Sequence, residues 1–285
     1  GSQTFSKSYM GWVLGKAPLY AKSGYGCEII DLDGNNFIDY IMALMPVVLG
    51  YSDSFVDSAV VKQLKYGTSL SLSSELEAQL SEMLVKLIPC AEMVRFGKNG
   101  SDVTTAAIRL ARAYTAKDKV IVCGYHGWHD WFIGTTEKNL GVPKEIKELS
   151  ISVPYNNIDF LKKTLSNNKG KIACIIIEAT GKVEPSKRFL KEVRDLCNKQ
   201  EIILIFDEVI SGFRVNIGGA QKEYSVIPDL ACFGKAMANG YPISALVGKR
   251  KIMDIMQNIF FSTTFGGEVA SIAAAISTIE KLIDT

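Results

Sequence analysis

A lysine that follows an apolar segment, Lys235, is the first candidate for chemistry in this sequence. Residues 230–233 read LACF, one glycine separates them from Lys235, and small residues and a Gly-Tyr-Pro turn come next. Most lysines pack the stem on the surface and keep the ammonium in water. A lysine at the end of a buried strand is instead desolvated, which lowers its pKa and makes its amine nucleophilic. The simpler alternative is a strand-end lysine that reaches solvent.

A carboxylate, Asp207, follows a second apolar segment. Residues 201–206 read EIILIF and are followed directly by Asp207, Glu208 and Val209. A buried carboxylate loses its hydration and is stable only beside a cation or a hydrogen-bond donor. Asp207 is therefore a candidate partner for a cationic group of a ligand, and the alternative is a cap for the next helix.

A glycine and a serine, Gly100 and Ser101, stand at the start of a predicted helix. Residues 99–102 read NGSD, and residues 102–116 have helical periodicity. The first backbone N–H groups of a helix have no partner inside it and bind phosphate readily. We therefore consider a phosphate site at Gly100 and Ser101, with an ordinary N-cap as the alternative.

An aromatic segment follows a third apolar run. Residues 119–123 read KVIVC and residues 124–130 read GYHGWHD. Aromatic side chains at a strand end suit a flat ligand held by stacking. His126, His129 and Asp130 raise a metal site as an alternative, and a packed loop with buried histidines is another. The six cysteines have no consistent metal-ligand spacing, so no metal site is predicted.

These groups can meet only if their segments lie side by side in one sheet. The apolar runs are unbroken and rich in β-branched residues, and helix-like segments separate them, which predicts an α/β fold with a mostly parallel sheet covered by helices on both faces. Ligands bind outside the carboxyl ends of such strands. The predicted strands are 119–123, 171–177 and 201–206, and the predicted helices are 74–88, which opens with the capping box Ser74–Glu77, 102–116 and 189–197.

The first 50 residues differ from the rest of the chain. Asp33-Gly34 lies between two strand-like runs and predicts a hairpin, so a small antiparallel element precedes the α/β body. At the other end, residues 268–283 have a helical pattern without a stop signal, which indicates a truncated chain.

Composition narrows the possible partners and the compartment. The chain has 32 Lys+Arg against 30 Asp+Glu, spread along its 285 residues, so no nucleic-acid or membrane partner is expected. The six cysteines form no CxxC pair and several lie in apolar runs. They predict reduced core residues of a cytoplasmic protein.

The candidate groups together fit one cofactor, pyridoxal 5′-phosphate (PLP). Its aldehyde needs a lysine for a Schiff base, its ring nitrogen an acid, its ring a stacking face, and its phosphate a helix N-terminus. The sequence supplies all four, three of them after apolar strand-like runs and the fourth at a predicted helix start, which favours the buried, reactive interpretation of Lys235.

The sequence resembles the class III, fold-type-I PLP-dependent aminotransferases, in the branch that contains glutamate-1-semialdehyde aminomutase. The most specific segment is residues 204–253, LIFDEVISGFRV through PISALVGKRKIM, and residues 31–40 (DLDGNNFIDY), the NGSD segment and YHGW match in order. The resemblance covers nearly the whole chain. It implies that residues 51–285 form the PLP-binding large domain and that residues 1–50 belong to a small second domain, whose C-terminal part is absent from this chain.

The resemblance also implies roles for individual residues. Lys235 would form the Schiff base with the cofactor and then carry the proton between substrate and cofactor. Asp207 would pair with the protonated ring nitrogen. Val209 would pack on one face of the ring and Tyr125 on the other.

The same resemblance places the phosphate and a second subunit. Gly100 and Ser101 would bind the phosphate at their helix N-terminus. Thr264, in the segment STTFGGE, matches a threonine that reaches the phosphate of the neighbouring subunit. A homodimer with shared active sites is therefore expected.

The sequence departs from the family pattern at several points. Ile210 stands where many relatives have glutamine, and Glu178 is followed by alanine instead of proline. Residues 128–131 (WHDW) differ from the corresponding aminomutase loop, and Thr264 is followed by an unusual Phe-Gly-Gly-Glu. Lys7 lies roughly where aminomutases use an arginine for the substrate carboxylate, but a solvated lysine is the simpler interpretation. These differences argue against an aminomutase proper.

The leading hypothesis is an aminotransferase that moves an amino group between an amino donor and a small polar carbonyl acceptor through Lys235. One alternative is a glutamate-1-semialdehyde-type 2,1-aminomutase, which transfers the amino group within one molecule. Another is a chain that binds PLP without turnover. A dinucleotide-binding oxidoreductase is disfavoured, because no G-x-G-x-x-G motif follows a predicted strand.

Overall fold

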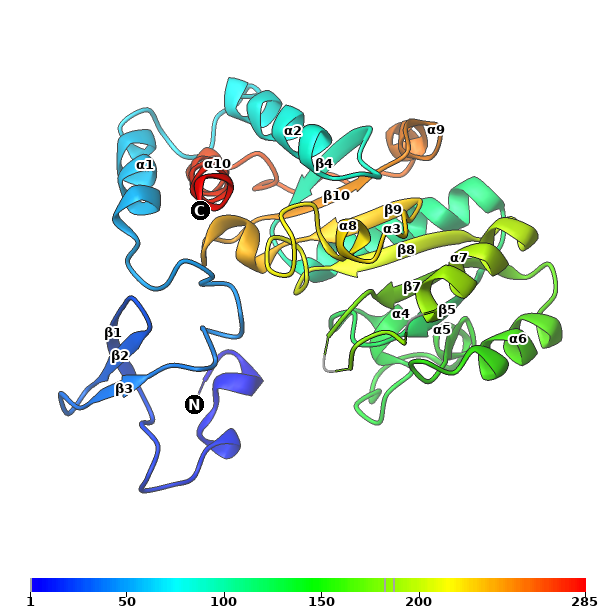
Figure 1. Ribbon diagram of the computed structural model, residues 1–285, viewed down its shortest axis with the longest axis horizontal. Coiled ribbons are helices and arrows are strands. Elements are labelled where there is room, and N and C mark those ends of the chain that lie inside the picture. The colour runs from blue at the N-terminus through cyan, green and yellow to red at the C-terminus, as the bar shows by residue number, and fades with distance from the viewer. Residues whose placement is uncertain (1, 182, 187) are drawn as a thin grey trace.

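The computed structural model describes residues 2–181, 183–186 and 188–285, and a seven-stranded sheet forms its centre (Figure 1). Strand β10 is antiparallel to both of its neighbours, and the remaining strands run parallel to one another. This confirms the predicted mostly parallel sheet, which places several carboxyl ends at one edge. In sheet order the strands are β4 (Met93–Gly97), β10 (Ser244–Gly248), β9 (Leu230–Phe233), β8 (Ile203–Glu208), β7 (Ile172–Glu178), β5 (Lys119–Cys123) and β6 (Ser150–Ser152).

Hydrophobic cores lie on both faces of this sheet. Along β7, Ile175 and Ile177 belong to one core, whereas Cys174 and Ile176 belong to the other. Because consecutive strand residues point to opposite faces, a strand between two cores is apolar throughout. This is why the predicted strands read as unbroken apolar runs.

Helices cover both cores. On one face lie α3 (Gly100–Thr115), α9 (Arg250–Met253) and the 3₁₀ helix η4 (Asp254–Asn258). On the other lie α1 (Ser54–Leu64), α2 (Glu75–Leu87), α6 (Ile158–Asn167), α7 (Phe189–Gln200) and α10 (Val269–Asp284). Shorter helices are η1 (Phe5–Lys7), η2 (Tyr9–Gly11), α4 (Asp130–Ile133), α5 (Lys144–Glu148), α8 (Ala220–Glu223) and η3 (Lys235–Ala238).

The predicted capping box at the start of α2 is present. Ser74 Oγ accepts from the N–H of Leu76 at 3.3 Å, and Glu77 Oε1 accepts from the N–H of Ser74 at 2.9 Å. These bonds satisfy backbone groups that the helix itself cannot pair, so the local sequence fixes where α2 begins.

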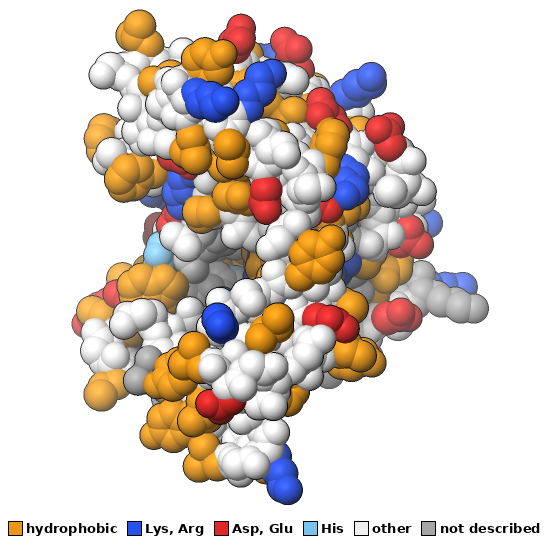
Figure 2. All heavy atoms as spheres, turned by 90° about the vertical axis from the view of Figure 1, so that its left-hand side faces the viewer, with side chains coloured by type: hydrophobic (Ala, Val, Ile, Leu, Met, Phe, Trp, Pro, Cys, Tyr) orange, Lys and Arg blue, Asp and Glu red, His pale blue; other side chains and the backbone are white. Residues whose placement is uncertain are grey.

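The N-terminal part forms a separate three-stranded antiparallel sheet (Figure 1). Its strands are β1 (Ala21–Tyr25), β2 (Glu28–Asp31) and β3 (Asn36–Ile38). The Asp33-Gly34 turn joins β2 to β3, and Gly34 has a φ of +87°, which confirms the predicted hairpin. The side of the molecule on which this sheet and α1 lie carries many apolar side chains around a central hollow (Figure 2).

Five of the six cysteines are buried, as expected for core residues, but Cys27 is exposed at the turn between β1 and β2. The expectation of a core position was wrong there because the small sheet buries few of its residues. All six cysteines are free. Within the described part of the chain, no helix is long and apolar enough to cross a bilayer.

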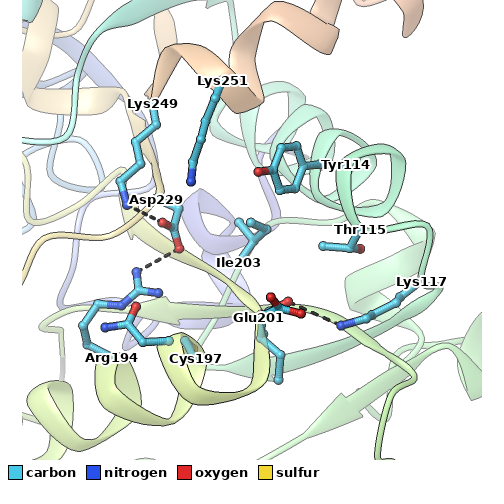
Figure 3. A pocket seen from close by; sticks show the side chains of 12 residues that line it. Tyr114, Thr115, Lys117, Arg194, Cys197, Glu201, Ile203, Asp229, Lys249 and Lys251 are labelled. Atoms are coloured by element: carbon cyan, nitrogen blue, oxygen red, sulfur yellow. Dashed lines mark hydrogen bonds and ion pairs between the residues drawn. The ribbon is translucent and has the colours of Figure 1, made fainter.

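At the amino edge of the sheet, opposite the carboxyl ends, cations surround Asp229 in a hollow of about 520 Å³ (Figure 3). Asp229 Oδ2 lies 2.8 Å from Arg194 Nη1, and Oδ1 lies 2.6 Å from Lys249 Nζ. Asp229 Oδ2 also accepts from the N–H of Leu204 at 2.9 Å. The carboxylate therefore ties α7, the start of β8 and the chain after β10 to one point.

We predict that Asp229→Asn lowers the free energy of unfolding by about 2 kcal/mol, because it leaves the positive charges of Arg194 and Lys249 without a partner. Burial by itself would raise the pKa of Asp229, but the bonds from Lys249, Leu204 and Arg194 outweigh it and lower the pKa. Since the folded pKa lies below the unfolded one, the contribution is present above about pH 4 and is lost in stronger acid.

Urea unfolding of both proteins across this pH range measures the effect. The difference should shrink as the pH falls below about 4. Glu148→Gln is the control, because the ion pair of Glu148 with Lys144 is exposed and should contribute less than about 0.5 kcal/mol. A stability difference that does not depend on pH would contradict the role of the Asp229 charge.

Candidate active site

The carboxyl edge of the large sheet brings together most of the residues that the sequence singled out. Asp207, in β8, is directly beside Glu178 in β7 and Cys232 in β9. Strand β9 then ends at Phe233, two residues before Lys235. The parallel register thus places an amine and two carboxylates at the ends of three adjacent strands. Asp207 lies within β8 itself, whereas the sequence had placed it just after the strand.

Lys235 is the first residue of η3 and has an unusual backbone. Its φ is +41°, in a region that non-glycine residues rarely adopt and that occurs preferentially at functional sites. The side chain is partly buried. Burial lowers the pKa of Lys235, the charges of Asp207 and Glu178 raise it, and that of Arg214 lowers it; the net change is downward. A larger share of the amine is therefore neutral and nucleophilic than in an exposed lysine.

The Asp207 carboxylate is 6% exposed and is held by two donors. His126 Nδ1 lies 2.8 Å from Asp207 Oδ2, and the N–H of Val209 donates to Oδ1 at 3.1 Å. His126 is itself 2% exposed and packs against Trp131 and Phe132, with ring centroids 6.3 Å and 5.3 Å away. The orientation of the carboxylate is thus fixed before any ligand binds, and each oxygen keeps an acceptor site for another donor.

The start of α3 offers free N–H groups. The Asp102 carboxylate accepts from the N–H groups of Lys98 and Asn99, at 3.0 and 2.8 Å. Across the described ranges, by contrast, no hydrogen bond is donated by the N–H of Gly100 or Ser101. These two amides lie at the positive end of a 16-residue helix, so they can bind an anion such as a phosphate.

Two glycines allow the surrounding loops to meet at this helix end. A Cβ on Gly100 would lie 3.0 Å from Cγ1 of Val209, so Val209 packs directly on the helix start. Gly127 has a φ of +105°, and a Cβ there would overlap Ser101 Oγ. The loop after β5 therefore reaches the helix only because residue 127 has no side chain.

Tyr125 is fixed by its backbone, while its side chain is 60% exposed. Its N–H donates to Glu178 Oε2 at 2.9 Å, and its ring meets Phe132 edge-on with centroids 5.4 Å apart. Burial raises the pKa of Glu178, and the bond from Tyr125 opposes this effect. The ring is consequently available to a flat ligand at the same edge as Asp207.

Thr264 and Lys7 are not joined to this group. Thr264 lies in an exposed turn before α10, and among the described residues no hydrogen bond links it to the other six predicted site residues. Lys7 is exposed in η1 and lines a separate, apolar cavity beside the small sheet. In residues 2–181, 183–186 and 188–285, no three His, Cys, Asp or Glu side chains cluster as a metal site would require.

Sequence reasoning missed the part that His126 plays and did not consider Arg214. His126 had been treated only as a buried or metal-binding residue, although it supports Asp207 from a different strand end. Arg214 was passed over because it follows Asp207 in an unremarkable loop. The sequence did offer one signal: His126 follows Tyr125 just after the predicted strand 119–123. The structure places that strand two positions from β8, which brings His126 within reach of Asp207.

The chain matches the family model for Aminotransferase class-III over residues 14–285. It belongs to the class III aminotransferases. It is 44% identical over 279 residues to a 3-aminobutyryl-CoA aminotransferase of Cloacimonas acidaminovorans, which covers 95% of this chain and 67% of that protein. It is 39% identical over 285 residues to a glutamate-1-semialdehyde 2,1-aminomutase of Methanocaldococcus jannaschii, with 94% and 67% covered.

Solved structures agree with this family and its cofactor. An omega-transaminase of Sphaerobacter thermophilus superposes with a TM-score of 0.88 at 27% identity, covering 98% of this chain and 69% of that one. The PLP internal aldimine form of the FumI protein of Sphingopyxis sp. MTA144 superposes with a TM-score of 0.91 at 29% identity, covering 100% and 69%. This aminotransferase therefore has the fold-type-I architecture and depends on PLP.

The described residues of the aminotransferase fit PLP in chemistry as well as in fold. The free amides of Gly100 and Ser101 suit its phosphate, and the fixed carboxylate of Asp207 suits a protonated ring nitrogen. The amine of Lys235 has a lowered pKa, as Schiff-base formation requires.

We predict that Gly127→Ala weakens PLP binding about tenfold, because the new methyl group displaces Ser101 from the start of α3. Gly141→Ala is the matched control: Gly141 also has a positive φ, +87°, but a Cβ there meets nothing within 4 Å. PLP titration followed by absorbance measures the affinity of each variant. Equal losses in both variants would mean that backbone strain, and not the contact with Ser101, is responsible.

Proposed function

We propose that this aminotransferase transfers an amino group between an amino donor and a small polar carbonyl acceptor, with Lys235 as the Schiff-base lysine. The observation that carries the proposal is the placement of the Lys235 amine and the Asp207 carboxylate on adjacent strand ends, beside the free amides of α3. These are the groups that PLP chemistry needs at one edge of a sheet.

Each residue has a distinct task in this proposal. When bound, PLP supplies an aldehyde that condenses with amines and a ring that withdraws electrons from the carbon next to the nitrogen. The amino donor would take the place of the Lys235 amine on the cofactor. The freed amine would then act as a base, take the proton from the donor carbon next to the nitrogen and deliver it to the cofactor. Asp207, held by His126, keeps the ring nitrogen protonated.

The remaining residues hold the cofactor in place. The amides of Gly100 and Ser101 would hold the phosphate at the start of α3. Val209 and Tyr125 would pack on opposite faces of the ring and exclude water from it. Ile210 brings no hydrogen-bonding group to the position where many relatives carry glutamine.

The relatives indicate which donors to test. The 44% identical protein is named a 3-aminobutyryl-CoA aminotransferase, so β-amino acids and β-aminoacyl thioesters are the first donors, followed by common α-amino acids. The second candidate function is an intramolecular aminomutase, supported by relatives with that name at 37–40% identity. The different loop at Trp128–Trp131 favours the aminotransferase.

We also propose a homodimer in which Thr264 reaches the phosphate of the neighbouring subunit. Its exposed turn before α10 leaves the side chain free for a contact with a second copy. Residues 1–50 would be part of a small domain and residues 51–285 the PLP-binding domain. A cytoplasmic location is consistent with six free cysteines.

The test is an absorbance spectrum of the protein with PLP, before and after adding each donor. We expect a visible band that disappears in Lys235→Ala and bleaches when a true donor is added. Lys119→Ala is the control, because Lys119 is also a partly buried strand-end lysine but lies at the amino edge, bonded to Asn168. Its band should match that of the unchanged protein.

The other outcomes separate the alternatives. A band that depends on Lys235 but that no added donor bleaches would contradict the aminotransferase. Reaction with the aminomutase's own substrate would then favour the aminomutase, and no reaction would favour a chain that binds PLP without turnover. A band that survives in Lys235→Ala would overturn the assignment of the Schiff-base lysine.

A further inference from the structure

Four consecutive residues between β3 and α1 have a left-handed backbone. Met42, Ala43, Leu44 and Met45 have φ angles of 54°, 56°, 72° and 77°, and none of them is glycine. L-amino acids avoid this region, and when they visit it they do so as single residues. Such a turn persists only where the surrounding structure imposes it, and it is typical of functional sites.

Part of the support for this turn is local. The Asp39 carboxylate accepts from the N–H groups of Ile41 and Ala43, at 2.7 and 3.4 Å, and from the hydroxyl of Tyr51 at 2.5 Å. The N–H groups of Leu44 and Met45 both bond to the carbonyl of Ile41. These bonds shape the start of the turn, but they do not attach it to the large sheet.

Arg214 makes that attachment. It belongs to the loop after β8, and its Nη2 donates to the carbonyl of Met45. Its Nη1 lies 3.8 Å from Met42 Sδ, and its Nε lies 3.3 Å from the carbonyl of Ile210. No carboxylate in the described part of the chain forms an ion pair with Arg214. One planar guanidinium therefore bridges both ends of the 42–45 turn to the loop that follows Asp207.

A second attachment comes from the helix that begins at Lys235. Asn239, at the end of η3, accepts from the N–H of Leu49 at 2.8 Å and donates to the carbonyl of Gly50 at 2.9 Å. The segment that follows the 42–45 turn is thus bonded to the helix of Lys235. In Figure 1 the segment between β3 and α1 passes from the small sheet to the end of the large one.

We propose that Arg214 is a positioning residue that holds the 42–45 turn as one side of the space in which the amino donor reaches Lys235. The inference rests on the proposed function. Arg214 joins the turn to the loop that follows Asp207, and Asn239 joins the segment after the turn to the helix that begins at Lys235, so both attachments lead to the strand ends that carry the candidate site. A turn fixed beforehand spares the donor the entropy of ordering it, so Arg214 strengthens donor binding without taking part in proton transfer.

The test compares Arg214→Met and Arg214→Lys with the unchanged protein. In Arg214→Met, we expect the donor concentration for half-maximal bleaching of the PLP band to rise about tenfold. The maximal bleaching rate and the PLP affinity should change by less than about threefold. Arg214→Lys keeps the charge, but its donors are all on one nitrogen, which cannot reach the carbonyls of Met45 and Ile210 as the separate guanidinium nitrogens do, so a smaller rise is expected.

A readout that does not depend on activity is the hydrogen exchange of the backbone amides in residues 41–47. Exchange should be about tenfold faster in Arg214→Met than in the unchanged protein, because the turn loses the bond from Arg214 to the carbonyl of Met45. Arg112→Met is the matched control, because Arg112 also donates to a backbone carbonyl, that of Asp118. Arg112 lies in the last turn of α3, at the end of the helix that is far from the carboxyl edge of the sheet. Its exchange in residues 41–47 and its donor binding should be unchanged.

The inference is wrong if Arg214→Met and Arg214→Lys bind the donor within twofold of the unchanged protein, or if residues 41–47 exchange at the same rate. It is also wrong if both variants lose PLP binding or unfold, since Arg214 would then be a general structural residue. Absence of a Lys235-dependent band in the unchanged protein is a different result, because it overturns the proposed function itself.

Discussion

The buried carboxylate of Asp207 is the constraint on which the rest of the site depends. A carboxylate that is 6% exposed must have donors around it, and the structure supplies His126 on one oxygen and the N–H of Val209 on the other. Meeting this requirement brings the loop after β5 and the loop after β8 to the same strand end. Those loops also carry Tyr125 and Val209, so the same bonds that satisfy the charge place the two groups that are proposed to flank the cofactor ring.

The neighbouring residue, Glu208, extends this arrangement away from the site. Side chains alternate along β8, and Glu208 is fully buried on the side opposite Asp207. It accepts from the N–H groups of Ala220 and Gln221, at 2.6 and 3.1 Å, and from the Ser211 hydroxyl at 2.8 Å. Burial raises the pKa of Glu208, and these bonds oppose that effect. These bonds close the loop that carries Arg214. The end of β8 therefore orients Asp207 in the candidate site and, through Arg214, the 42–45 turn.

The sequence predicted those features that depend on local pattern and missed those that depend on contacts between distant segments. The capping box at Ser74 and the unbroken apolar strands follow from short-range rules, and the structure confirms both. The antiparallel direction of β10 was not predicted, because it depends on how the chain returns after η3 and not on composition. The left-handed backbone at residue 42 and its neighbours was equally hidden, since no glycine marks it and its support comes from Arg214, far away in the sequence.

The amine of Lys235 shows how these contacts combine into reactivity. Burial favours the neutral form of the amine, whereas Asp207 and Glu178 favour the charged form and limit how far the pKa falls. A fully buried lysine without acids nearby would have no means of holding a proton, and an exposed one would rarely release it near neutral pH. Partial burial beside two carboxylates gives an amine that can do both. A residue that must first take a proton as a base and later deliver it as an acid needs that balance. The balance arises because β7, β8 and β9 end at the same edge in register.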